Sequence, residues 1–168
     1  MAPFQKEVEL FDEVLGISLR VAETIIPEIG VNMDVFPTEK HLVSWAALCP
    51  GNNESAGKHK SGKTRKGNPY LKRVLTEAAN ACGNSKNSYL GARYQRLAKR
   101  RGRKKAIVAI AHSILIIAYH ILKYKTPYYD LGPNYFGKIN RRYLVRYHQK
   151  RLQSLGFKVT IETLEEAA

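Results

Sequence analysis

Hydrophobic positions recur along most of this chain at the three- and four-residue spacing of amphipathic helices, while alternating, strand-like stretches are scarce. The most apolar run, AIVAIAHSILIIAYHIL at residues 106–122, predicts a helix over about residues 104–124. Such continuous hydrophobicity is typical of a helix that is buried on all sides. The pattern therefore predicts an all-α fold, in which a helical bundle surrounds one apolar helix.

The N-terminal part predicts two helices joined by the short turn LGIS at residues 15–18. The first runs over about residues 3–14 and places Phe4, Val8 and Phe11 on one face. The second runs over about residues 19–29, with Ser18 as its N-cap and Gly30 as its terminator. Two interpretations of the pair stay open: a plain helical corner, or a helix–hairpin–helix over about residues 3–30 that offers backbone N–H groups to a DNA phosphate.

Caps and breakers define the remaining helices. Thr38 caps a third helix, whose inward-facing side chains are expected to be Leu42, Val43, Trp45, Ala46 and Leu48. Asn68 and Pro69 begin a fourth helix, which is expected to end near Cys82 with Gly83 as its terminator. Ser88 caps a fifth helix that ends at Gly102, and a basic helix over about residues 139–155 follows the turn-rich segment 126–136.

The predicted organisation is a helical domain over residues 1–136 followed by a basic C-terminal helix and tail over residues 137–168. Within the first part, the helical pair is followed by a polar loop at residues 49–68 and a bundle at residues 69–124. A chain of 168 residues is long enough to bury one hydrophobic core.

Charge changes the picture, because it is both large and uneven. The net charge is +14, and residues 55–161 contain 25 Lys or Arg against two acids, which gives 25 − 2 = +23 for that window. Before residue 55 only three basic residues stand against nine acids. Clustered Lys and Arg bind polyanions by releasing counterions from phosphates, so the sequence predicts a nucleic-acid partner.

Other features exclude several classes of protein. The two cysteines, Cys49 and Cys82, form neither a disulfide framework nor a zinc pattern, and both are expected to be reduced. No signal peptide is recognised, and the apolar helix interrupted by His112, Ser113 and His120 fits a buried core better than a membrane span. A cytoplasmic protein is therefore expected. His112 and His120 are expected to be buried histidines rather than metal ligands, and Trp45 to be a core residue.

The loop segment NNESAGKHKSGKTRKGNPY at residues 52–70 is the best candidate for chemistry. Three glycines allow close approach of the backbone to a phosphate, and Lys58, Lys60, Lys63, Arg65 and Lys66 supply positive charge. Residues 57–64 also fit the spacing of a nucleotide-binding P-loop, but no strand and no βαβ unit is predicted around them. Ser55 and Ser61 are each either a turn serine that binds the backbone or a nucleophile beside cations.

Two further basic clusters follow. RLAKRRGRKK at residues 96–105 crosses a helix break, which suits it to a nucleic-acid backbone, although a solvated helix end remains possible. RRYLVRYHQKR at residues 141–151 interleaves arginines with Tyr143 and Tyr147. These tyrosines are four apart, so they either pack on the helix or stack on bases.

The block LVSWAALCPGNNESAGKHKSGKTRKGNPYLKRVLTEAANA at residues 42–81 resembles the C-terminal transposase domain of the IS110 (IS116) family of bridge-RNA-guided insertion-sequence transposases. The resemblance continues over about residues 14–136. It implies a DNA recombinase in which Ser55 attacks a phosphodiester, forms a phosphoserine intermediate and exchanges strands without net hydrolysis. Ser61 is a distant second candidate.

The resemblance also sets expectations for the other groups. Lys58, Arg65, Lys66 and Arg73 could support the transition state or simply position DNA, and the full set of expected nucleic-acid contacts is Lys58, Lys60, Lys63, Arg65, Lys66, Lys72, Arg73, Arg100, Arg101, Arg103 and Lys104. Family members carry an N-terminal RuvC-like domain that binds Mg²⁺, and this chain is expected to leave no room for one. No cofactor is therefore expected in this chain, which is expected to be inactive without such a partner domain.

DNA is the expected partner, with guide RNA and a second copy of the chain as further partners that the family implies. The alternative to a transposase domain is a non-catalytic nucleic-acid-binding remnant of a truncated transposase.

Overall fold

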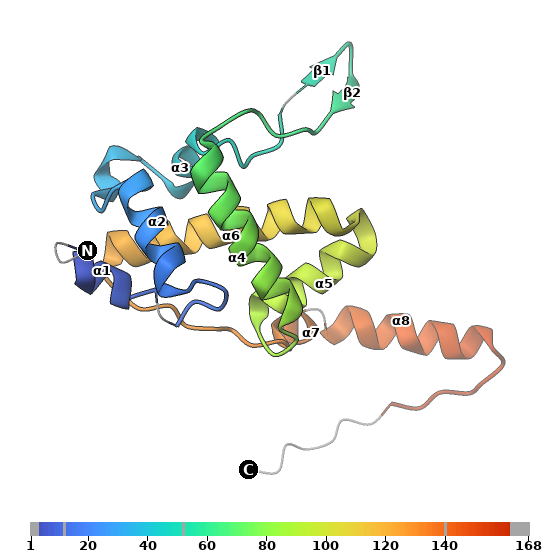
Figure 1. Ribbon diagram of the computed structural model, residues 1–168. Helices are drawn as coiled ribbons and strands as arrows, with labels where there is room; N and C mark the ends of the chain where they lie inside the picture. Colours follow the sequence, from blue (N-terminus) through green and yellow to red (C-terminus); the bar gives the residue numbers. More distant parts are fainter. Residues whose placement is uncertain (1–3, 12, 52, 140, 162–168) are drawn as a thin grey trace. The chain divides into compact units, whose positions relative to one another are not determined.

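The computed structural model describes residues 4–11, 13–51, 53–139 and 141–161, and most of them are helical (Figure 1). The all-α prediction is confirmed, with a two-stranded hairpin as the one described sheet. The chain forms two compact units, Met1–Pro133 and Asn134–Ala168. Each unit is described by itself below.

The core of the first unit is built around α6 (Arg103–Tyr124). It packs against α3 (Glu39–Trp45), α4 (Pro69–Asn84) and α5 (Tyr89–Arg101). By length and composition α6 could cross a membrane, but most of its apolar stretch is buried inside the unit, as expected of a core helix. Tyr119 of α6 is buried and donates its hydroxyl to the Phe36 carbonyl oxygen at 3.1 Å, which fixes the segment before α3 on the core.

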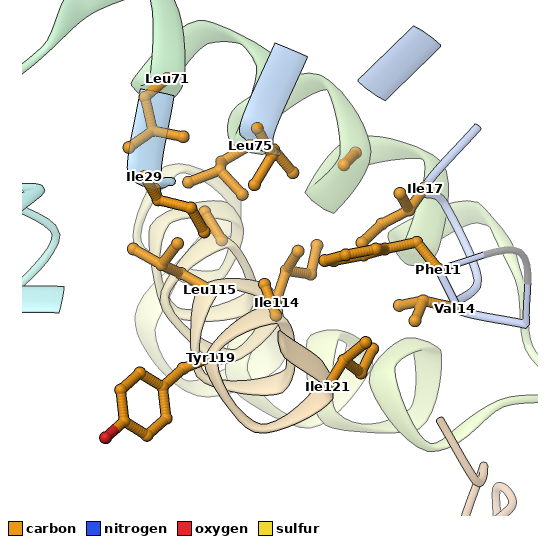
Figure 2. Packing of buried hydrophobic residues seen from close by; sticks show 14 of the residues in the cluster. Phe11, Val14, Ile17, Ile29, Leu71, Leu75, Ile114, Leu115, Tyr119 and Ile121 are labelled. Carbon is orange, nitrogen blue, oxygen red and sulfur yellow. The ribbon is translucent and has the colours of Figure 1, made fainter. Parts of the chain in front are cut away.

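The first helix is shorter than predicted, because α1 spans only Gln5–Glu9. Beyond it the N–H groups of Phe11, Val14 and Ile17 each donate to the carbonyl oxygen three residues earlier, at 2.9–3.0 Å. Turns with three residues per repeat place every third side chain on the same side. Val8, Phe11, Val14 and Ile17 are all buried for this reason, and Figure 2 shows Phe11 pointing toward Ile114 of α6.

The turn before α2 (Leu19–Ile29) packs directly on α4. Gly16 has φ +84°, and a Cβ there would lie 2.6 Å from the Ala78 carbonyl oxygen and 2.7 Å from Cys82 Sγ. The Cys82 thiol donates to the Leu15 carbonyl oxygen at 2.8 Å. Burial raises the pKa of Cys82 to about 11, so the thiol keeps the proton that this hydrogen bond uses.

Helix α4 does not end at Cys82, as the sequence predicted, but continues to Asn84. Gly83 lies inside the helix and packs against the ring of Tyr94 on α5, so its small size serves helix packing rather than helix termination. Helix α5 begins as predicted: the Ser88 hydroxyl accepts a hydrogen bond from the Gly91 N–H at 3.0 Å.

The inward placement of Trp45 is wrong. Trp45 is 51% exposed, whereas Leu42, Val43, Ala46 and Leu48 are buried. Helix α3 ends at Trp45, and Ala47 adopts φ +55°, so the chain turns inward just after the indole and leaves it outside. The η2 turn (Met33–Val35) precedes this helix, and the ring of Phe36 lies 5.6 Å from that of Trp45.

The second unit contains α7 (Tyr135–Ile139) and α8 (Arg141–Ser154). The predicted basic helix corresponds to α8, while α7 occupies the end of the segment that was predicted to be a turn-rich loop. The Asn134 carbonyl oxygen accepts from the Lys138 N–H at 3.0 Å, which shows that these turn residues also start a helix. Tyr143 and Tyr147 are exposed and stack on each other, with ring centroids 6.3 Å apart.

Replacement of Gly16 by alanine tests the packing of the turn on α4. Gly16→Ala should lower the free energy of unfolding by ~1–3 kcal/mol more than Gly30→Ala, because the new methyl group is overpacked against α4. Gly30 is the matched control, since it also has positive φ but no atom lies within 4 Å of the position that its methyl group would take. Urea denaturation of both variants measures the difference, and equal losses of stability would contradict the close contact.

Candidate active site and nucleic-acid interface

The predicted serine loop is a β-hairpin over much of its length. Strand β1 (Asn53–Ser55) pairs antiparallel with β2 (Lys58–Ser61), and this hairpin arm, residues 53–61, extends away from the helices (Figure 1). Ala56 and Gly57 form the two-residue turn with φ of +51° and +71°. Positive φ at both turn positions matches the twist of paired strands, so the turn determines the hairpin although the strands are polar.

Ser55 is the last residue of β1 and lies at the tip of the hairpin arm. It is exposed and pairs across the turn with Lys58. Directly opposed residues of an antiparallel pair project to the same face, so Lys58 is the cation nearest to Ser55 along the arm. The Ser61 hydroxyl accepts a hydrogen bond from the Lys63 N–H at 3.2 Å, whereas the Ser55 hydroxyl has no hydrogen-bond partner among the described residues.

The base of the hairpin arm, called its foot below, consists of Pro50 and Gly51 on one side and Lys63 and Thr64 on the other. Backbone and side-chain contacts hold it. The Gly51 N–H donates to the Lys63 carbonyl oxygen at 3.1 Å, and Pro50 forms a bridge with Thr64. Lys72 of α4 donates to the Thr64 hydroxyl at 3.0 Å. These contacts tie the two ends of the arm to each other and to the first turn of α4.

The connector from the arm to α4, residues 62–68, is fixed against α3. The Arg65 guanidinium donates through Nη2 to both the carbonyl oxygen and the hydroxyl of Ser44, each at 3.1 Å. A Cβ on Gly67 would lie only 2.7 Å from the Cβ of Ala47, so the connector runs in close contact with the end of α3. The foot of the arm is therefore positioned by packing as well as by hydrogen bonds.

Asn68 links the connector to two helices. The side-chain oxygen Oδ1 of Asn68 accepts hydrogen bonds from the N–H groups of Tyr70 and Leu71 at 2.9 and 3.2 Å, which caps α4 as predicted. Its amide nitrogen donates to the carboxylate of Glu28 on α2. One side chain thus satisfies the start of α4 and attaches it to the N-terminal part of the fold.

The predicted cations divide into two groups around this arm. Arg65 and Lys72 have the partners described above, and Arg73 pairs with Glu77 at 3.0 Å on the exposed side of α4. No hydrogen bond or ion pair engages the side chains of the others within the described residues; these are Lys58, Lys60, Lys63 and Lys66, and all are exposed. The second group is available to a phosphate backbone without breaking a described contact.

A second basic patch lies at the corner between α5 and α6. Arg100 and Arg101 end α5, Arg103 and Lys104 begin α6, and all four side chains are exposed. Gly102 separates the helices with φ +84°. The structure brings these residues together as the sequence predicted, on a part of the first unit distinct from the hairpin arm (Figure 1).

The P-loop spacing at residues 57–64 has a different structure from that of a nucleotide-binding loop. A strand does precede Gly57, contrary to the sequence prediction, but Lys58–Ser61 is itself the second strand of the hairpin. A phosphate cradle between the two glycines would need a loop that leads into a helix.

The LGIS turn at residues 15–18 packs on α4 through Gly16. The phosphate contact that the sequence suggested for this turn stays a prediction.

The histidines and acids of the described part of the chain do not gather into a metal site. No group of three His, Cys, Asp or Glu side chains there could hold an ion. Burial, with a smaller effect from Arg93, lowers the pKa of the half-buried His112, and His120 stacks on Tyr124 with ring centroids 5.7 Å apart.

Comparison with known proteins places this site within a family. Residues 8–95, more than half of the chain, match the sequence model described as "Transposase IS116/IS110/IS902 family". The matched range contains the hairpin arm, its foot and the whole of α4. A search of curated proteins found no match.

Removal of the Arg65 side chain tests how the arm is anchored. Arg65→Ala should lower the hydrogen-exchange protection of the Gly51 amide by roughly 2- to 10-fold, because loss of a hydrogen-bonding group from the foot eases its local opening. Lys66→Ala is the matched control, since it removes the same charge from an unengaged neighbour. Amide exchange followed by NMR gives both values, and unchanged protection in Arg65→Ala would show that the contact with Ser44 does not hold the foot.

Proposed function

The chain belongs to the IS116/IS110/IS902 transposase family, and from that premise we propose that Ser55 is the nucleophile of DNA strand exchange. The observation that carries the proposal is the position of Ser55 at the exposed tip of a hairpin arm whose foot is fixed. The nucleophilic oxygen must come into contact with a phosphorus atom of the DNA backbone. A narrow arm with a two-residue turn at its tip allows this approach.

The proposed reaction is a transfer of one phosphodiester bond. Ser55 Oγ attacks the phosphorus, a phosphoserine bond forms, and the bond from phosphorus to the leaving sugar oxygen breaks. The serine proton goes to a base and the leaving oxygen takes up a proton. The hydroxyl of the incoming strand then attacks the phosphoserine, which restores both the serine and a phosphodiester, so no bond is lost to water.

Cations of the arm support this reaction. Lys58 lies opposite Ser55 across the turn, where its ammonium group can approach the non-bridging oxygens of the attacked phosphate. Lys60, Lys63 and Lys66 extend positive charge from the arm toward α4 and position the DNA backbone. We assign Arg65 and Lys72 mainly to holding the foot, because both already have protein partners.

The remaining basic surfaces suit further nucleic-acid contacts. The patch at Arg100, Arg101, Arg103 and Lys104 is exposed and has no acidic residue in its sequence. It fits the backbone of DNA or of a guide RNA. Strand exchange brings two DNA molecules together, so by analogy with the family we propose that at least two copies of the chain assemble on the DNA.

The proton acceptor and the acidic Mg²⁺ site are proposed to come from a RuvC-like domain outside residues 1–168. The exposed tip of the arm is accessible to such a domain, and the DNA would lie between them. In the steps above, this chain supplies the nucleophilic hydroxyl and the cations, and that domain supplies the base.

A strand-exchange assay tests Ser55 directly. Wild type, Ser55→Ala and Ser61→Ala are each mixed with a RuvC-like partner domain and cognate element ends. Ser55→Ala should lower the exchange rate by at least about 1,000-fold, as expected when a covalent nucleophile is lost. Ser61→Ala should change it less than about threefold, because Ser61 lies at the other end of the same hairpin.

A measurement of DNA binding by the same variants separates an effect on catalysis from an effect on DNA affinity. Ser55→Ala should bind the same DNA as tightly as wild type, since it removes no charge. Equal exchange by wild type and Ser55→Ala would contradict the assignment. Salt-sensitive binding by wild type without any exchange would favour the non-catalytic, nucleic-acid-binding remnant instead.

A further inference from the structure

The indole of Trp45 stays accessible to solvent where α3 ends and the chain turns inward at Ala47. Tryptophan is among the most buried side chains on average, yet 51% of this residue is accessible. Its ring leans on Phe36 at 5.6 Å with an interplanar angle of 58°. Phe36 packs on the core and its carbonyl oxygen is held by Tyr119, so the indole is supported on one side and open elsewhere.

The residues on either side of Trp45 in the chain contact the connector, residues 62–68. Ser44, the preceding residue, accepts both hydrogen bonds from Arg65, and the following residues Ala46 and Ala47 contact Gly67. Lys63 and Lys66 flank Arg65 in the sequence and are exposed. Charges near Trp45 in the chain are mixed, with Asp34 in η2 and Glu39 beside Lys40 and His41 on α3, whereas the connector carries only positive charges.

An exposed aromatic ring beside a cationic backbone track is the combination that binds unpaired nucleic-acid strands. Every base has a π-face that can stack on an aromatic side chain, and the cations hold the adjoining phosphates. A partner protein that covered the indole would also have to cover the charged connector next to it. The arrangement therefore favours a polyanionic ligand that carries flat, apolar groups.

We propose that Trp45, supported by Phe36, stacks on an unpaired DNA base next to the strand that the hairpin arm engages. This inference rests on the proposed function, because a strand that is cut and exchanged leaves its duplex and exposes unpaired bases beside the break. Stacking at the foot of the arm holds one such base while Ser55 at the tip reaches the phosphate.

Trp45 is the single tryptophan of the chain, so its fluorescence reports on this site alone. Wild type is titrated with a fluorescently labelled single-stranded DNA, with its fully paired duplex and with RNA of the same sequence. Binding is followed by anisotropy of the label and stacking by tryptophan emission. Single-stranded DNA should quench the emission, and the duplex should bind with little quenching.

Variants show whether the ring contributes to affinity. Trp45→Leu should weaken binding of the single strand by roughly 5- to 150-fold, the range measured for loss of one stacked base, and should change duplex binding less than about twofold. Trp45→Phe keeps a stacking surface and should recover most of the affinity. Thermal unfolding of both variants checks that they remain folded.

Several outcomes would overturn the inference. One is single-stranded DNA that binds without quenching the tryptophan emission. Another is stronger quenching by RNA than by DNA. A third is quenching that appears when the protein concentration is raised without any DNA. The last result would identify a second copy of the chain as the occupant.

Ser55→Ala separates the two proposals, because it should keep the quenching in full. Loss of quenching in Ser55→Ala would contradict a stacking site at the foot of the arm. Normal quenching in a wild-type protein that exchanges no strands would leave the stacking site intact and overturn only the catalytic proposal.

Discussion

The double use of Asn68 is the constraint on which the rest of this site depends. Its side-chain oxygen caps α4, and its side-chain nitrogen donates a hydrogen bond to the Glu28 carboxylate on α2. The start of α4 is therefore fixed to α2. The connector of the hairpin arm ends at this residue, between Gly67 packed on α3 and Pro69 at the first turn of α4. The arm therefore leaves the bundle from a defined point.

A fixed foot and an exposed tip suit a protein that brings its nucleophile to a large substrate. Arg65 and Lys72 use their charges to hold the foot, which leaves Lys58, Lys60, Lys63 and Lys66 for phosphates. Trp45, which follows the Ser44 that holds Arg65, adds an exposed aromatic ring. The Lys and Arg residues of this segment thus divide between structural and binding roles. The sequence does not separate the two groups, but their side-chain hydrogen bonds in the structure do.

Sequence reasoning was most accurate where local chemistry determines structure. The caps at Asn68 and Ser88 and the apolar run of α6 define their helices without help from distant residues. The hairpin was missed because its strands are polar and at most four residues long, and because alanine is unusual at the first position of a turn with positive φ at both residues. Trp45 was misplaced because composition favours burial, whereas the left-handed Ala47 ends the helix and turns the chain. No local signal distinguishes Ser55 from Ser61; the family resemblance made that choice, and it stays a prediction.

The central claim is that the tip of the hairpin arm becomes covalently joined to DNA, and mapping of the trapped adduct tests it most directly. Wild type and a RuvC-like domain are incubated with a nicked suicide substrate that prevents resealing, and the covalent complex is digested and sequenced by mass spectrometry. The account predicts a nucleotide phosphate on Ser55. An adduct on Ser61, on Tyr70 at the start of α4 or on any residue outside the arm would contradict it.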